Sequence, residues 1–283
     1  MIIDSHLHVW DRARALYPWL TPEAGPLYRS YGFEEIAGSL AERNIEGAVL
    51  VQASDEAADT AIMRDVAAQH SAILGIVAWT PLDNPTQLAA DLDQFSDDPL
   101  IVGIRNLVHE RPPAWLDQAV VGEGLAILAA RGMPLDFPTA NHTGLAALAD
   151  LGRRHADLPI VIDHLGKPPI NGSADDRAHW RQLIAECARN PRTVAKISGL
   201  YASHGPLDSW TVDGIRPFVE DALELFTPAR LMYGGDWPIA ELAGGYGRSW
   251  DAIAEVLTSL GEPEREAIFG GTAARVYSLD LSN

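Results

Sequence analysis

The regular alternation of short apolar runs with longer amphipathic segments is the feature that most constrains the fold of this chain. Eight runs have the length and composition of buried β-strands. They cover residues 2–8, 47–53, 73–80, 101–108, 133–137, 159–164, 193–199 and 230–236. Eight segments of helical period lie between or after them, at 34–43, 58–70, 86–95, 123–131, 144–155, 176–189, 212–226 and 249–260. The pattern predicts eight consecutive β-then-α units.

Near-continuous apolar strands joined by helices predict a parallel sheet covered by those helices, because a parallel crossover needs about a dozen residues. Eight such units close naturally into a (β/α)8 TIM barrel. The alternative is an open doubly wound sheet, but the first strand is not followed by the glycine-rich turn of a dinucleotide-binding fold. No linker or internal repeat divides the sequence, so we expect residues 1–283 to form a single α/β barrel domain.

The charge balance excludes several classes of function. Lys and Arg total 21 against 39 Asp and Glu, which leaves a formal net charge of −18. A field of this sign repels nucleic-acid phosphates and anionic lipids, so we expect no nucleic-acid or membrane partner. The first residues lack a signal-peptide pattern, and the single Cys187 cannot form an internal disulfide. We therefore expect a cytoplasmic monomer or homodimer that acts on a small molecule.

Polar side chains gather where several of the predicted strands end. The first strand closes with His6 and His8, whose imidazoles point to one face because side chains alternate along a strand. The sixth strand closes with His164 and the eighth with Asp236. Active sites of (β/α)8 barrels lie at the carboxyl ends of the strands. We therefore expect these four side chains to converge at the barrel mouth.

Imidazoles and a carboxylate in this arrangement indicate a metal or water site. His6, His8 and Asp236 supply three ligands for a divalent cation and leave a fourth position open for water, the pattern of catalytic zinc. We expect one such cation, Zn²⁺, although the same groups could activate water without a metal. The expected catalytic residues are Asp236 and His164.

Longer motifs carry a resemblance to a known family. They are YPWL at 17–20, VLVQA at 49–53, GIR at 103–105, IDHLGKP at 162–168, KISGL at 196–200 and RLMYGGDWP at 230–238. With them the chain resembles the amidohydrolase superfamily over nearly its whole length. Within that superfamily it is most similar to the metal-dependent TIM-barrel hydrolases that include sugar lactonases such as L-fuconolactonase and L-rhamnonolactonase.

The resemblance implies roles for the residues at the strand ends. Asp236 resembles the catalytic aspartate of the superfamily, and His6 and His8 resemble its first-strand pair. His164 resembles its strand-six histidine, and Arg105 resembles the arginine with which the lactonases hold their substrate.

Some positions depart from the family pattern. Asn106 stands where this branch often has histidine, and Leu7 stands where it often has glutamine, so the substrate preference need not transfer. Asp136 stands in place of the strand-five histidine of two-metal members, and strand four offers no bridging lysine. These differences argue against a binuclear centre.

The resulting hypothesis is a hydrolase that opens a small lactone, preferably a sugar-acid lactone, with Asp236 as the base that activates water. Arg105 would orient the substrate through its planar fork of donors. Aromatic and polar residues near strand ends are further candidates for substrate binding, aromatic rings as flat walls for a sugar. They are Trp19, Trp79, His142 and Trp237, with Trp10 as another candidate wall.

Two alternatives remain open at this point. Non-oxidative decarboxylases of small unsaturated or aromatic acids use a similar set of histidines and aspartate on the same barrel. A non-catalytic barrel that binds a sugar acid is the second alternative. The sequence also leaves open the roles of His109, His142 and His204, and the ring size and stereochemistry of the lactone.

Overall fold

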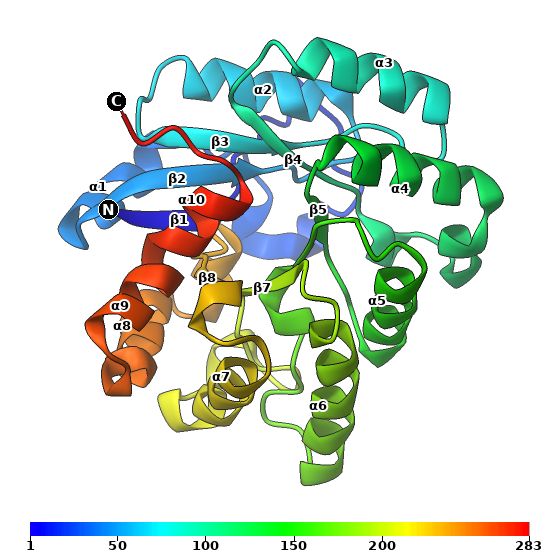
Figure 1. Cartoon of the computed structure of the whole chain (residues 1–283). Helices are drawn as coiled ribbons and strands as arrows, with labels where there is room; N and C mark the ends of the chain where they lie inside the picture. Colours follow the sequence, from blue (N-terminus) through cyan, green and yellow to red (C-terminus); the bar gives the residue numbers. More distant parts are fainter. Residues whose placement is uncertain (283) are drawn as a thin grey trace.

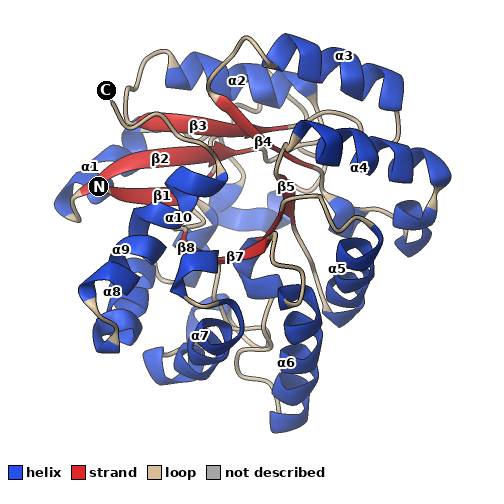
Figure 2. Cartoon of the chain, viewed as in Figure 1, coloured by secondary structure: helices blue, strands red, loops and turns tan. Residues whose placement is uncertain are grey.

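Eight parallel strands form one sheet that closes on itself in the computed structural model, which describes residues 1–282. The strands are β1 (Ile2–Leu7), β2 (Ile45–Val51), β3 (Ile73–Ala78), β4 (Ile101–Arg105), β5 (Leu135–Phe137), β6 (Ile160–Ile162), β7 (Thr193–Ile197) and β8 (Leu231–Tyr233). They neighbour one another in chain order. The backbone N–H groups of Asp236 and His8 donate to the carbonyls of His6 and Trp237, both at 2.8 Å, and join β8 to β1. The expected (β/α)8 barrel is confirmed (Figure 2).

Helices surround the strands on the outside of the barrel (Figure 1). They are α1 (Glu34–Glu42), α2 (Ala57–Ala67), α3 (Pro85–Phe95), α4 (Ala119–Arg131), α5 (His142–Arg154), α6 (Ala174–Ala188), α7 (Val212–Phe226) and α8 (Tyr246–Val256). The expected helices at 123–131 and 249–260 begin earlier, at Ala119 and Tyr246, because neither start carries a capping side chain that marks it in the sequence. Across the described residues, no helix combines the length and apolarity needed to cross a membrane.

Strand side chains alternate between two apolar layers. Leu50 and Ile76 pack in the cluster that joins the sheet to the surrounding helices. Their strand neighbours Val49, Val51 and Val77 belong to a separate cluster inside the barrel, together with residues of other strands. Burial on both faces explains why the strands are apolar along nearly their whole length.

A carboxyl-terminal segment that the alternation pattern did not predict packs against strands β1 and β8. It contains α9 (Glu262–Glu266) and α10 (Thr272–Val276). After α10, Tyr277 and Leu279 join the interior cluster, and the Tyr277 hydroxyl donates to Asp136 at 2.8 Å. No strand follows these short helices within the described residues, so they fall outside the repeating β-then-α pattern.

The long segment 10–30 lies next to the carboxyl end of β1 and has ordered structure of its own. It contains the short helix η1 (Pro22–Leu27). Reciprocal backbone hydrogen bonds of 2.9 and 3.1 Å join Trp10 to Tyr31, and the Trp10 indole donates to the carbonyl of Arg29. The loop is therefore fixed beside the barrel mouth.

Candidate active site

Four side chains from three strand ends meet around one carboxylate oxygen. The Oδ1 atom of Asp236 lies 3.8 Å from Nε2 of His6, 3.7 Å from Nε2 of His8 and 3.8 Å from Nε2 of His164. All four residues are buried. The structure thus brings together the residues that the strand-end pattern selects.

An irregular register in β1 places its histidines on the inner face of the barrel. Ile3 belongs to the interior cluster, and His6, an odd number of residues further on, also points inward to the other site residues. The pairing of β1 with β2 shifts between Asp4 and Leu7, which changes the alternation at this point. His8 then follows His6 on the same face.

Unusual backbone conformations present the other two site residues. His164 and Asp236 have φ angles of 55° and 52°, in the left-handed region that non-glycine residues rarely adopt. Gly199 also has a positive φ of 55°, and a Cβ added there would lie 2.6 Å from Nδ1 of His164 and 2.8 Å from Oδ2 of Asp236. Strain of this kind costs about 1–3 kcal/mol for each residue and concentrates at functional sites.

A chain of hydrogen bonds assigns the protons of the histidine pair. Nδ1 of His8 lies 2.7 Å from the carbonyl oxygen of Val51. Because a carbonyl oxygen only accepts, Nδ1 carries the proton and Nε2 of His8 carries a lone pair. Nε2 of His6 lies 3.1 Å from Nε2 of His8 and must donate its proton to the lone pair there. Nδ1 of His6 then accepts from the Lys196 ammonium at 3.0 Å.

Two cations and two carboxylates form a buried network beneath the histidines. Nε of Arg105 donates to Asp163 at 2.7 Å, and its Nη1 donates to the carbonyl of Gln52 at 2.9 Å. Lys196 donates to Asp136 and lies 3.4 Å from Oδ1 of Asp163. Burial raises the pKa of Asp136 to about 6 despite Lys196. Burial opposes ionisation of Asp163 as well, but its charged neighbours hold its pKa well below the usual range.

Burial and neighbouring groups set the protonation states at the mouth. Desolvation lowers the pKa of His6 and of His164 well below the usual histidine value, so both are neutral at pH 7. Desolvation acts to raise the pKa of Asp236, but the neighbouring His164 and Lys167 outweigh it and the net pKa is lowered. An ionised carboxylate therefore lies beside neutral imidazoles.

The donor set fits a zinc ion. His6, His8 and Asp236 form one group of convergent ligand atoms, and His6, Asp163 and His164 form another. The 3.1 Å between the Nε2 atoms of His6 and His8 is close to the spacing of about 3.3 Å for two imidazoles on tetrahedral zinc. Oδ1 of Asp163 has no hydrogen-bond partner among the described residues and lies 3.3 Å from Nδ1 of His6. It would accept the Nδ1 proton when Nε2 binds a metal.

A cavity of about 390 Å³, here called the mouth cavity, opens onto these residues. Its lining includes the polar groups His8, Arg105, His164 and Asp236 and the aromatic rings of Trp10 and Trp19. The Trp19 indole donates to the carbonyl of Ala53 at 2.7 Å, which fixes this ring at the wall. The cavity therefore joins reactive polar groups to flat apolar surfaces.

The sequence model of the amidohydrolase family matches residues 3–279. The chain belongs to the amidohydrolase family. It is 31% identical to an L-fucono-1,5-lactonase of Burkholderia ambifaria over 284 residues, which cover 98% of this chain and 96% of that relative. The resemblance inferred from the motifs is confirmed, and so is the expectation that the chain is an enzyme.

Solved structures agree with this assignment. A crystal structure of an amidohydrolase from Burkholderia multivorans with bound Zn is 30% identical, superposes with a TM-score of 0.89, and covers 99% of this chain and 100% of its own. A 5-carboxyvanillate decarboxylase from Sphingomonas paucimobilis has a TM-score of 0.66 at 14% identity, with 99% of each chain covered. That second likeness shows a shared fold only.

Three predicted substrate-binding residues of this amidohydrolase do not line the mouth cavity. Trp237 is 3% exposed and packs edge-on against Tyr31 at 5.4 Å. His142 is the first residue of α5 and packs against His179 at 4.7 Å. Trp79 follows β3 and is half-buried outside the described lining. Aromatic packing fixes Trp237 and His142 outside the mouth cavity, and Trp79 also lies outside its lining. The proposed site therefore does not include these three residues.

Lys196 and Asp163 belong to the site of this amidohydrolase although the strand-end pattern assigned them no role. The available signal was a lysine within an apolar strand, since a buried charge needs partners. Of the histidines left open by the sequence, His109 lines the mouth cavity and His204 is exposed outside it.

Proposed function

We propose that this amidohydrolase opens a small lactone, with sugar-acid lactones as the preferred class. One observation carries the proposal. The buried Asp236 has its Oδ1 among three imidazoles, while its Oδ2 has no hydrogen-bond partner among the described residues and the residue lines a cavity of about 390 Å³. Similarity over nearly the full length to an L-fucono-1,5-lactonase supports the choice of substrate class.

Asp236 serves both halves of the reaction. Its carboxylate takes a proton from water while the water oxygen bonds to the lactone carbonyl carbon. When the ring carbon–oxygen bond breaks, Asp236 returns the proton to the departing ring oxygen, which becomes a hydroxyl. The product is a hydroxy acid, whose carboxyl group then releases a proton to the solvent. Nδ1 of His164 lies 2.9 Å from Ser198 Oγ, and with that hydroxyl as the donor the Nε2 proton of His164 would stabilise the oxyanion.

One zinc ion would be held by His6, His8 and Asp236, and the Burkholderia multivorans relative with bound Zn supports this choice of metal. When bound, zinc supplies Lewis acidity toward the carbonyl or the attacking water. We expect elemental analysis of protein purified without chelator to give close to one or zero ions per chain. A stoichiometry near two, with activity that follows both ions, would contradict the single site.

Arg105 orients the substrate in this proposal. Its Nε and Nη1 are fixed by Asp163 and by the Gln52 carbonyl, so the guanidinium plane is held rigid at the cavity wall. Nη2 is then available to oxygens of the substrate, in a planar geometry that lysine cannot reproduce. Trp10 and Trp19 supply the flat surfaces against which a ring packs.

A panel of five- and six-membered aldonolactones, followed by proton release with a pH indicator, tests the proposal. We expect ring opening in the wild-type enzyme, with Asp236→Asn as the inactive control. Release of carbon dioxide from unsaturated or aromatic acids without any lactone opening would favour the decarboxylase alternative. Calorimetric binding of a sugar lactone without turnover would favour a binding protein, and either result overturns the proposed function.

A further inference from the structure

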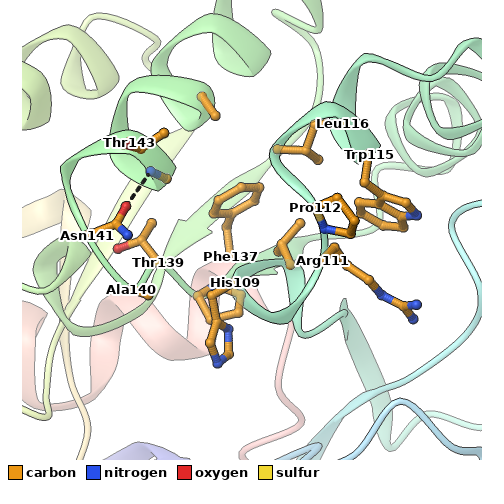
Figure 3. Close-up of a pocket in the computed structure, with 14 residues that line it drawn as sticks. His109, Arg111, Pro112, Trp115, Leu116, Phe137, Thr139, Ala140, Asn141 and Thr143 are labelled. Atoms are coloured by element: carbon orange, nitrogen blue, oxygen red, sulfur yellow. Dashed lines mark hydrogen bonds between the residues drawn. The ribbon is translucent and has the colours of Figure 1, made fainter.

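A second cavity of about 240 Å³, here called the side cavity, lies next to the mouth cavity. It is bounded by the loop that contains η2 (Val108–Glu110) and η3 (Pro113–Asp117), and by the start of α5 (Figure 3). Both cavities are lined by His109, Pro138, Thr139 and Ala140. We call these four shared residues the neck. The two cavities therefore adjoin at the neck.

The walls of the side cavity are mainly apolar. They include Phe137, Leu116, Trp115, Val108 and Ala147. The guanidinium of the one charged lining residue, Arg111, is paired with Asp55 at 2.8 Å and points away from Phe137 (Figure 3). A cavity of about 150 Å³ already holds a benzene molecule, so this volume fits an aromatic ring or a chain of about five carbons.

The neck carries an unpartnered polar atom. Thr139 is 3% exposed, and its Oγ1 is buried with no hydrogen-bond partner among the described residues. A buried hydroxyl without a partner costs free energy, so such an atom beside two cavities points to a ligand that supplies the partner. His109 lies at the same neck, and burial with the charges of Arg105 and Lys167 lowers its pKa to about 4. The neck is therefore polar but carries no net charge at pH 7.

We propose that the side cavity is a subsite for an apolar substituent of the lactone. It rests on the proposed function: when the ring lies at Asp236, a substituent of up to about five carbons extends past the neck into the side cavity. Thr139 then binds a polar atom of the ring edge next to that substituent. The substrates of this enzyme accordingly extend beyond sugar acids to lactones that carry an alkyl chain.

Two six-membered lactones that differ only in a methyl or pentyl group next to the ring oxygen test the subsite. Each buried methylene raises kcat/KM about three- to fourfold, so the four extra methylenes raise it on the order of 100-fold at full burial. Ordering the chain offsets part of this gain. We expect kcat/KM to be about 10- to 100-fold higher for the pentyl lactone in the wild-type enzyme.

Matched variants on α5 locate the effect. Ala147 lines the side cavity and not the mouth cavity, so Ala147→Phe fills the subsite without touching the reacting groups. The exposed Ala146 precedes it on the same helix and lines neither cavity, so Ala146→Phe is the control. We expect Ala147→Phe to abolish the advantage of the pentyl lactone and to leave the methyl lactone within about twofold. We expect Ala146→Phe to change neither.

Equal rates for the two lactones, or a pentyl advantage that survives Ala147→Phe, would overturn the subsite while leaving lactone hydrolysis intact. The matching methyl and pentyl lactams, which resist hydrolysis, separate the two proposals further. If no lactone is opened, but the pentyl lactam binds at least about tenfold more tightly by calorimetry and Ala147→Phe removes the difference, the subsite stands and the proposed function fails. Equal binding of the two lactams overturns the subsite in either case.

Discussion

Lys196 on β7 reaches across the barrel interior to His6 on β1, with its Nζ 3.0 Å from Nδ1 of the imidazole. An ammonium group only donates, so this contact makes Nδ1 of His6 the acceptor and directs the Nε2 proton toward His8. The same ammonium lies between Asp136 and Asp163. The orientation of the histidine pair therefore depends on a charge network that lies beneath the mouth cavity.

Replacing Lys196 with Met should destabilise the protein strongly. The change leaves Asp136 and Asp163 buried without their shared cation, and breaking a buried pair from one side costs about 3–5 kcal/mol. Lys196→Met/Asp136→Asn should recover at least half of the loss, because the amide that replaces the carboxylate carries no charge to be compensated. Urea unfolding of the two variants checks this. A loss of less than about 1 kcal/mol in the single variant would show that the pair contributes no more than a surface ion pair.

Asp236→Asn should reduce kcat by at least about 10²–10⁴-fold, because the amide keeps the shape of the side chain and loses the basic oxygen. The rate is measured with a good lactone at saturating concentration. An unchanged urea midpoint serves as the control for folding. If the variant keeps more than about a tenth of the wild-type kcat, Asp236 is not the base.

Arg105→Lys should lower kcat/KM by about 10- to 100-fold, the value of one or two hydrogen bonds from a charged donor. The size of the loss should vary with the oxygens that the lactone presents, because lysine keeps the charge and loses the planar fork. Arg64→Lys is the matched control, since Arg64 pairs with Asp98 at 2.8 Å and lines neither cavity. Similar losses in the two variants would remove the special role of Arg105.

Thr139→Val should raise stability and lower activity together. Its hydroxyl is buried without a partner among the described residues, so a methyl group of the same shape should add up to about 1 kcal/mol to the free energy of unfolding. If the substrate supplies the missing partner, kcat/KM falls in the same variant. Thr86→Val, at an exposed position on α3 outside the lining of both cavities, is the control. A variant that loses stability would show that the hydroxyl has a structural partner.

His109 should make the protein less stable in acid. Burial and the charges of Arg105 and Lys167 lower its pKa to about 4 from the ordinary 6.5. Between these values the unfolded chain binds more protons than the folded one, so stability is lost as the pH falls through this window. Relative to wild type, His109→Gln should gain about 1–2 kcal/mol in the free energy of unfolding between pH 7 and pH 5. Urea unfolding of the two proteins at both pH values measures this, and an equal loss of stability in His109→Gln and wild type would contradict the assignment.

Much of this architecture could be predicted from the sequence because it depends on local periods. Burial on both faces makes a strand apolar, an amphipathic helix must follow it, and eight repeats of the pair close into a barrel. The period of two then places His6 and His8 on one face, and parallel strands bring their carboxyl ends to one mouth. These rules were sufficient to select His164 and Asp236 as well.

Loop paths and long-range pairing were decided only by the tertiary structure. The strand-end rule does not say which way a loop turns, so it could not separate Trp19, which lines the mouth cavity, from Trp237, which packs against Tyr31. The contact between Lys196 and His6 joins residues 190 positions apart, and it depends on the stagger of strands around the barrel. Sequence period indicates which side chains share a face only where a strand is regular, while register shifts such as that in β1, and the neighbours of each side chain inside the barrel, follow from how all eight strands pack.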